Sequence, residues 1–321
     1  MRERIQALLD ESSRINLEKE RVYWYPLSLA TYGADEVLEA LDSLVSFRTT
    51  MWNKTRDFEE LFATKQGARE AVMVNSGSSA DLVVAFALTN PSRQLLARGD
   101  EVLVPSVTWP TQIWSVLMAG LTVRLVDTDS ETLNVDLRDL EAKIGPRTRA
   151  ISLVHLMGNP VDMDRVMDLC RRHNLVLIED CCEALGASFG GVNVGNFGAA
   201  STFSFFFSHH ITTMEGGMIS TSDPELSDLC RLLRAHGWAR NTKYLPAQPA
   251  SGIDPRYVFR NWGFNVRPTE LQAGFGLRQM ARLPEFQAQR AKNAAQIVRS
   301  IASHRKLLRP MAIHPRATCS W

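Results

Sequence analysis

The segment from Ser204 to Gly217 carries the residues best suited to acid–base chemistry. It reads SFFFSHHITTMEGG, so the adjacent His209 and His210 follow an aromatic run and precede a Glu-Gly-Gly turn. An imidazole with a pKa of about 6.5 suits proton transfer at neutral pH. The same residues also fit an aromatic sheet core followed by an ordinary loop histidine, so this segment alone leaves both interpretations open.

A second candidate is the run of small residues from Asn75 to Ala80, which reads NSGSSA between a predicted strand and a predicted helix. Such a turn lets backbone N–H groups and hydroxyls converge on an anion at the positive end of the helix dipole, so a phosphate site is physically natural here. The alternative is a flexible connection in which a serine caps the helix.

A third candidate is Asp180, which ends the apolar run LVLIED over 175–180. A carboxylate at the C-terminal tip of a central parallel strand is desolvated, and it requires a cationic partner such as a charged group of a ligand. The alternative is an aspartate that caps the next turn. The two residues that follow, Cys181 and Cys182, are interpreted as small buried side chains rather than ligands.

Short β-branched runs alternate with amphipathic stretches from about residue 70 to 220, a pattern typical of βαβ units around a mostly parallel sheet. Such sheets bind ligands at the carboxyl ends of their strands. The predicted strands are 70–75, 101–105, 122–127, 149–156, 175–180, 201–207 and 217–221. The predicted helices are 79–89, 111–119, 136–143, 162–173 and 224–235, the last with Asp223 as its cap and Pro224 at its first position.

The remaining chain is less regular. We expect helices within 1–65, a long loop at 238–262, which is rich in Pro, Gly and polar residues, and a helix from Pro268 to about 300. The stretch from 305 to 321 shows neither helical nor strand periodicity.

Composition excludes several classes of protein. With 45% hydrophobic and 22% charged residues in 321, the chain is an ordinary globular protein, and its formal charge of +1 provides no field to attract nucleic acid or anionic membrane. The five cysteines contain no CxxC pair and indicate neither a disulfide framework nor a four-cysteine metal site. The charged N-terminus and the lack of a long apolar run favour a cytoplasmic protein.

Taken together, the motifs resemble those of the DegT/DnrJ/EryC1/StrS sugar aminotransferase family, fold type I enzymes that depend on pyridoxal phosphate (PLP). The resemblance covers roughly residues 25–300. It is carried by NSGSSA, the VTWPT segment around Trp109, VHLMGNPVDM, IEDCCEALGA, SFFFSHHITTMEGG and the GFNVR segment at 263–267. The resemblance implies a seven-stranded, mostly parallel sheet flanked by helices.

One position departs from the family in a way that changes the expected reaction. His209 stands where the family has its Schiff-base lysine, and no lysine occurs between Lys143 and Lys243. The chain therefore resembles the lysine-less branch, the sugar 3-dehydratases that use pyridoxamine phosphate (PMP). Histidine moves protons but cannot tether the cofactor covalently. The resemblance implies that His209 is the acid–base catalyst in removal of the C3 hydroxyl from a nucleotide-linked 4-keto-6-deoxyhexose, with PMP regenerated from glutamate.

The resemblance also assigns cofactor contacts. Asp180 matches the partner of the pyridinium nitrogen, Glu183 lies near the cofactor hydroxyl and Trp109 stacks on the ring. The phosphate contacts match Gly77, Ser78 and Ser204, together with Asn265 and Arg267 from the neighbouring subunit of a homodimer with shared sites. No metal is expected. The long loop 238–262 contains no cysteine, so the iron–sulfur cluster of the CDP-sugar enzymes has no ligands there.

Two alternatives stay open: a nucleotide-sugar aminotransferase, and a catalytically inactive or truncated homologue that acts as a binding partner. A nicotinamide enzyme is disfavoured because no GxGxxG follows the first strand. We expect an N-terminal helical segment at 1–25, a large PLP/PMP-binding α/β domain at 26–262, and at 263–321 an interface loop, a long helix and the start of a truncated small domain. Met214 replaces a family glycine, so a positive φ there would carry strain.

Overall fold

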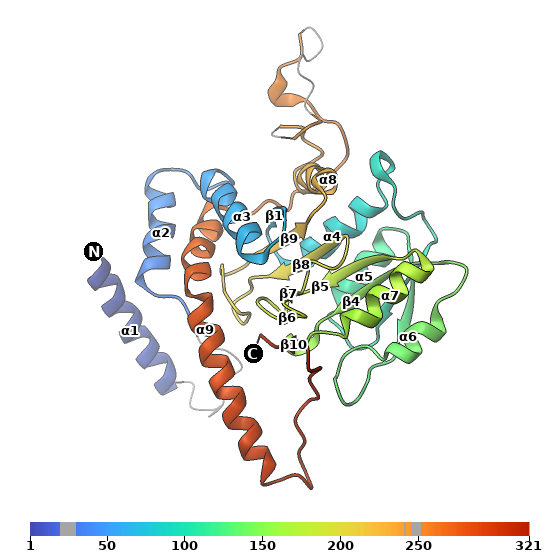
Figure 1. The fold of residues 1–321 in the computed structure, drawn as a ribbon. Coiled ribbons are helices and arrows are strands. Elements are labelled where there is room, and N and C mark those ends of the chain that lie inside the picture. The colour runs from blue at the N-terminus through green and yellow to red at the C-terminus, as the bar shows by residue number, and fades with distance from the viewer. Residues whose placement is uncertain (20–29, 241, 245–251, 321) are drawn as a thin grey trace.

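The computed structural model describes residues 1–19, 30–240, 242–244 and 252–320. A seven-stranded sheet runs through its centre (Figure 1). In spatial order its strands are β1 (Glu70–Val74), β9 (Gly217–Thr221), β8 (Ala200–Ser204), β5 (Val176–Asp180), β4 (Thr148–Val154), β2 (Glu101–Pro105) and β3 (Thr122–Val126). From β8 to β3 all neighbours are parallel, whereas β9 is antiparallel to both β1 and β8. The predicted α/β fold with a mostly parallel sheet is confirmed.

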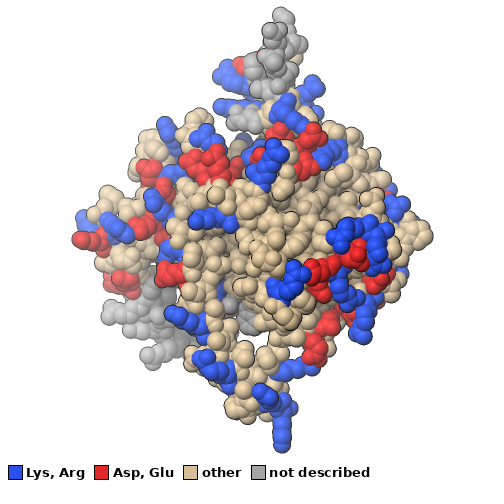
Figure 2. Space-filling view, viewed as in Figure 1, with Lys and Arg blue, Asp and Glu red and all other residues tan. Residues whose placement is uncertain are grey.

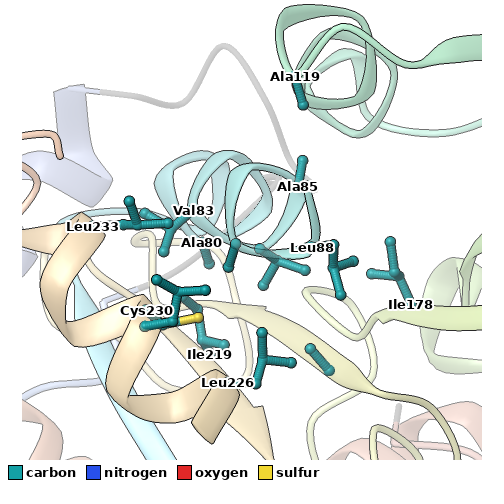
Figure 3. Packing of buried hydrophobic residues seen from close by; sticks show 14 of the residues in the cluster. Ala80, Val83, Ala85, Leu88, Ala119, Ile178, Ile219, Leu226, Cys230 and Leu233 are labelled. Atoms are coloured by element: carbon teal, nitrogen blue, oxygen red, sulfur yellow. The ribbon is translucent and has the colours of Figure 1, made fainter. Parts of the chain in front are cut away.

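Alternate residues of the strands face opposite helix layers, as the pleat of a sheet requires. Val72 and Val74 of β1 pack with α4 (Gly77–Leu88), α5 (Pro110–Met118) and α8 (Pro224–Arg234) on one face. Figure 3 shows part of this layer, with Leu88 of α4, Ile219 of β9 and Leu226 of α8 among its side chains. Ala71 and Met73 face the other layer, formed by α3 (Asn53–Gln66) and α9 (Glu270–Ala302). Towards β3, the same layer is formed by α6 (Leu137–Lys143) and α7 (Met163–His173).

The remaining elements lie outside these layers. α1 (Arg2–Lys19) contacts α2 (Ala34–Val45), which packs on α9. A small sheet consists of β6 (Ser188–Phe189), β7 (Val192–Asn193) and β10 (Ala317–Thr318). The described residues also include the short 3₁₀ helices η1 (Pro91–Arg93), η2 (Leu156–Gly158) and η3 (Pro255–Tyr257).

Capping residues explain where the main helices begin. The Asp223 side chain accepts the N–H groups of Glu225 and Leu226, with Pro224 at the first helical position, as predicted. Thr269 and Gln272 form a capping box at the start of α9. This helix continues through Pro284 to Ala302, close to the predicted end near residue 300.

The structure corrects two predictions. The strand predicted over 201–207 ends at Ser204, because the N–H of Phe206 bonds to the Ser204 Oγ and leaves the ladder. The stretch after 305, predicted to be patternless, contributes β10, which pairs with β6 through Ala317 and Thr318. The predicted boundary at 25/26 falls within 20–29, outside the described residues, as do 241 and 245–251 of the predicted loop.

Charged side chains of both signs surround a broad uncharged area on the face shown in Figure 2. This mixed pattern agrees with the balanced composition, 36 basic against 35 acidic residues. In the parts of the chain that the structure describes, no helix has the length and apolarity needed to cross a membrane.

Candidate active site

The turn between β1 and α4, residues 75–78, has the geometry of an anion site and is called the anion turn. Ser76 caps α4 by accepting the Ser79 N–H on its Oγ at 3.1 Å. Gly77 and Ser78 therefore occupy the first helical turn, where backbone N–H groups have no partner within the helix. Gly77 lies so close to β8 that a Cβ there would be 2.7 Å from the Ser204 Cβ. The structure thus brings the predicted Gly77, Ser78 and Ser204 together at the positive end of a helix.

Gly217 completes this turn, and sequence reasoning did not select it. A Cβ on Gly217 would lie 2.2 Å from the Ser76 carbonyl oxygen and 2.7 Å from the Gly77 nitrogen. Gly217 is also paired with Val74 and with Ser204 in the sheet. The second glycine of the Glu-Gly-Gly motif therefore allows β9 to pack directly on the anion turn. The motif itself was the sequence signal that could have identified Gly217.

Asp180 is a buried carboxylate, 3% exposed, at the C-terminal end of β5. Its Oδ1 accepts the Cys182 N–H at 2.9 Å, so the residue also caps the next turn. No arginine or lysine pairs with it within the described residues. Burial raises its pKa, and the nearby Glu183 carboxylate acts in the same direction. A cationic group of a ligand would stabilise the ionised form.

His209 lies half-buried in the loop that joins β8 to β9. The strand residues at the two ends of this loop, Ser204 and Gly217, both contact the anion turn. Burial, together with the positive charge of Arg290 on α9, lowers the pKa of His209 to about 4. The imidazole is therefore neutral at pH 7, the state required of a base.

His210 is more deeply buried than its neighbour, at 6% exposure, and both ring nitrogens lack a hydrogen-bond partner. The Ser320 backbone approaches the ring without completing a bond of normal geometry. Burial lowers the pKa of His210 to about 3. Two adjacent histidines thus have different environments, and the more accessible one is His209.

Met214 adopts the left-handed conformation expected for a residue at a family glycine position, with φ of 69°. Its N–H bonds to the Thr212 Oγ1 at 3.0 Å. A side chain in this region costs about 1 to 2 kcal/mol, and the loop after His209 accommodates that strain.

Glu183 and Trp109 are both accessible. Glu183 follows Asp180 by one turn, and its carboxylate accepts the Met157 N–H at 2.6 Å. Trp109 precedes α5 at the end of the β2 connection and is 69% exposed. An indole left open to solvent beside a strand's carboxyl end is available to stack on a ligand.

Asn265 and Arg267 lie together on the segment that approaches the anion turn. The Arg267 Nε donates to the Asn265 Oδ1 at 3.0 Å. Between them, the Val266 carbonyl accepts the Asn75 N–H at 3.0 Å. The Oδ1 of Asn75 is buried without a partner. The contact of Asn265 and Arg267 with the phosphate in a neighbouring subunit stays a prediction.

A buried group of His155, Glu179 and Cys181 has ligand atoms within 4.8 Å of one another, but other contacts already occupy it. The Glu179 carboxylate accepts N–H groups from Gly195, Phe197 and Gly198 at 2.7 to 2.8 Å and also contacts the His155 Nε2. This arrangement fixes the loop beside β5 and therefore the strand that ends in Asp180.

The match to known proteins covers most of the chain. Residues 31–321 match the model of the DegT/DnrJ/EryC1/StrS aminotransferase family. GDP-4-keto-6-deoxy-D-mannose 3-dehydratase of Yersinia pseudotuberculosis is 39% identical over 285 residues, 87% of this chain and 72% of the relative. GDP-perosamine synthase of Caulobacter vibrioides is 40% identical over 258 residues, 80% of this chain and 64% of the relative.

Solved structures show the same fold. A crystal structure of GDP-4-keto-6-deoxymannose-3-dehydratase with a trapped PLP–glutamate geminal diamine superposes with a TM-score of 0.87 at 35% identity, covering 92% of this chain and 77% of the other. The family match agrees with the structure, which has a fold type I sheet, an anion turn before α4 and a buried aspartate at the end of β5. The chain belongs to the DegT/DnrJ/EryC1/StrS aminotransferase family.

Proposed function

We propose that this chain is a PMP-dependent dehydratase that removes the C3 hydroxyl from a nucleotide-linked 4-keto-6-deoxyhexose. The proposal rests on His209, a neutral and accessible imidazole at the position where the sequence resemblance places the family's lysine. The relative from Yersinia pseudotuberculosis, which matches 87% of the chain, is named for a reaction of this class.

The residues present fit a pyridoxal-type cofactor. The anion turn supplies the backbone N–H groups of Gly77 and Ser78 for a phosphate, because both residues lie in the first turn of α4, where N–H groups have no partner within the helix. Asp180 supplies a buried carboxyl that has no arginine or lysine partner among the described residues, which suits a protonated ring nitrogen. We assign Trp109 to the ring face and Glu183 to the region of the ring hydroxyl. When bound, the cofactor's conjugated ring accepts the electrons released from a bond beside its amine-bearing carbon.

His209 would move the proton in this reaction. With the cofactor bound, the neutral imidazole would remove a proton from its C4′ carbon and would then donate that proton to the sugar's C3 hydroxyl, which would leave as water. A bound phosphate dianion would oppose the effect of Arg290 and raise the pKa of His209 towards neutrality, making it a better base. Because an imidazole forms no stable link to an aldehyde, the cofactor is free to leave, and glutamate is the proposed amino donor that restores PMP.

A homodimer with shared sites is part of the proposal. Three large apolar side chains of α5 are strongly exposed, namely Trp114 at 56%, Leu117 at 45% and Met118 at 63%. An exposed apolar helix face of this kind is typical of a protein interface. In the dimer, Asn265 and Arg267 would reach the partner's phosphate site. We also keep the division into 1–25, 26–262 and 263–321 as a proposal.

The second candidate is nucleotide-sugar transamination, which the 40% identity to a GDP-perosamine synthase favours. The two reactions give different products. Dehydration removes the oxygen at C3, whereas transamination places an amine at C4.

The test combines purified protein, PMP, glutamate and a panel of GDP-, CDP- and dTDP-linked 4-keto-6-deoxy sugars, with products identified by mass. Loss of the C3 oxygen from one sugar supports dehydration, and gain of an amine supports transamination. Failure to bind PMP or PLP would contradict both and favour an inactive homologue.

Variants at His209 test its role directly. His209→Lys should produce the absorbance of a Schiff base with PLP and suppress dehydration, because the lysine holds the aldehyde covalently. His209→Asn, which neither tethers the cofactor nor accepts a proton, should bind PMP and lose at least a hundredfold in dehydration rate. Dehydration at the original rate in either variant would show that His209 is not the base.

A further inference from the structure

Asp81 is the only charged residue in α4, whose sequence is GSSADLVVAFAL, and it is 9% exposed. It follows Gly77 by four residues, so it lies on the same face of the helix, one turn further from the anion turn. That face packs against β8, where the Ser204 side chain meets Gly77. Asp81 therefore lies beneath the proposed cofactor site rather than at the protein surface.

Two neutral hydroxyls are the hydrogen-bond partners of the Asp81 carboxyl. The Thr202 Oγ1 lies 2.7 Å from its Oδ1, and the Thr111 Oγ1 lies 3.1 Å from its Oδ2. Within the described residues no arginine, lysine or histidine forms an ion pair with it. A hydroxyl donates or accepts, so both contacts are compatible with a protonated carboxyl as well as with a carboxylate.

The second carboxyl of the site is close by. Thr202, which contacts Asp81, stands opposite Asp180 in the β5–β8 ladder. The two carboxylates also act on the same thiol, because the negative charges of Asp180 and Asp81 both raise the pKa of Cys182. Two buried carboxylates that share neighbours cannot both ionise cheaply in the absence of a cation.

The surroundings decide which of the two holds the proton. Burial and the charge of Asp180 raise the pKa of Asp81 well above its usual value. Asp180 has compensation that Asp81 lacks, since its carboxyl accepts the Cys182 N–H and feels the favourable field of His155. The ionised form is therefore better stabilised at Asp180.

We propose that Asp81 and Asp180 share one proton, carried by Asp81, so that the site presents a single negative charge to the ring nitrogen of its cofactor. Asp81 is then a positioning residue: because it is neutral, Asp180 is the ionised member of the pair, and Asp81 itself does not touch the reacting atoms. The cofactor part of this inference rests on the proposed function, whereas the shared proton does not.

The first test uses the protein without cofactor. Asp81→Asn keeps the shape of the side chain and is neutral at every pH. A raised pKa in the folded state makes the wild type lose stability as pH rises from the usual aspartate value of about 3.9 to the folded value. Over that window the folding equilibrium constant of Asp81→Asn relative to wild type should increase about tenfold per pH unit, measured by urea denaturation. A ratio independent of pH would overturn the proposal.

The same comparison made in an Asp180→Asn background, with Asp81→Asn/Asp180→Asn measured against Asp180→Asn, tests the pairing. Removing the charge of Asp180 lowers the pKa of Asp81, so the pH-dependent window should become narrower than in the wild type. An unchanged window would show that the two carboxyls are independent. If Asp81→Asn does not fold, infrared spectroscopy of the wild type with ¹³C-labelled aspartate replaces the stability measurement. The proposal requires the band of a protonated aspartic acid at neutral pH, and a spectrum that contains carboxylate bands alone would refute the proposal.

The second test measures PMP binding by tryptophan fluorescence at pH 7. Asp81→Asn should bind PMP within about threefold of wild type, because it mimics the proposed neutral state, while Asp180→Asn should lose at least tenfold in affinity. An equal loss in both variants would overturn the proposal by showing that Asp81 is ionised. Absence of PMP binding to the wild type would refute the proposed function and leave the stability result to decide on the shared proton.

Discussion

Substituting Gly217 by alanine tests whether contact between β9 and the anion turn shapes the cofactor site. The added Cβ would lie 2.2, 2.4 and 2.7 Å from the Ser76 oxygen, the Ser76 carbonyl carbon and the Gly77 nitrogen. Non-bonded heavy atoms normally remain about 3.5 Å apart, so the turn or β9 must move by about 1 Å. Because all three atoms belong to the backbone, no side chain can rotate away. We expect a loss of stability at the upper end of the overpacking range, about 3 kcal/mol.

The same displacement should weaken binding of a phosphate at the turn. Losing one hydrogen bond from a backbone N–H to a charged group costs about 1.5 to 3 kcal/mol, which is about 10- to 150-fold in affinity. Urea denaturation would measure the first effect and PMP titration the second. Gly145→Ala is the matched control, because the nearest atoms to its Cβ lie 3.8 and 4.0 Å away. If Gly217→Ala matched this control in both assays, the tight contact would have no role in shaping the site.

Three further perturbations have defined outcomes. The pKa values of His209 and His210 are about 4 and about 3 in the folded protein, against 6.5 in the unfolded chain, so both side chains bind protons on unfolding below pH 6.5. The free energy of unfolding should therefore fall as pH drops below 6.5, and His210 alone should account for about 2 kcal/mol of that loss at pH 5. His210→Asn should reduce the change in unfolding free energy between pH 7 and 5, measured by urea denaturation, and an unchanged pH dependence would contradict this assignment. Glu59→Gln should cost about 3 to 5 kcal/mol, because Arg231 and Arg234 each lie 2.6 Å from the buried carboxylate, and its loss leaves Arg234 without a counter-charge and Arg231 with only Glu70 at 3.5 Å. A cost below 1 kcal/mol in urea denaturation would refute this reasoning. Trp109→Ala should leave the urea midpoint within the range of surface substitutions but weaken PMP binding two- to tenfold, and unchanged affinity would exclude stacking by this indole.

Much of the sheet was predictable because its strands are short, apolar and bounded by turn residues. The strand predicted over 101–105 coincides with β2, and 217–221 coincides with β9. The prediction over 201–207 failed at its end because hydrophobicity does not distinguish a strand from a buried turn. Phe205 is fully buried yet lies past the last ladder residue, and Phe206 is 46% exposed.

Two features of the site could not be found by pattern alone. Gly217 matters through contact with Ser76, a residue far away in the sequence. Asp81 lies in the first turns of a helix, where an aspartate is ordinarily explained by the helix dipole, and only the packing of α4 on β8 shows that it is buried beside Asp180. The small sheet was missed because strands of two residues have no periodicity to detect.

The position of β9 has a consequence for synthesis of the chain on the ribosome. β1 ends at Val74, and its partner β9 begins at Gly217. At about 5 to 20 residues per second, translation takes roughly 7 to 30 s to supply that partner. During this interval the nascent chain carries an unpaired apolar edge that chaperones can recognise. The pocket for a small cofactor therefore cannot be assembled until most of the polypeptide has been made.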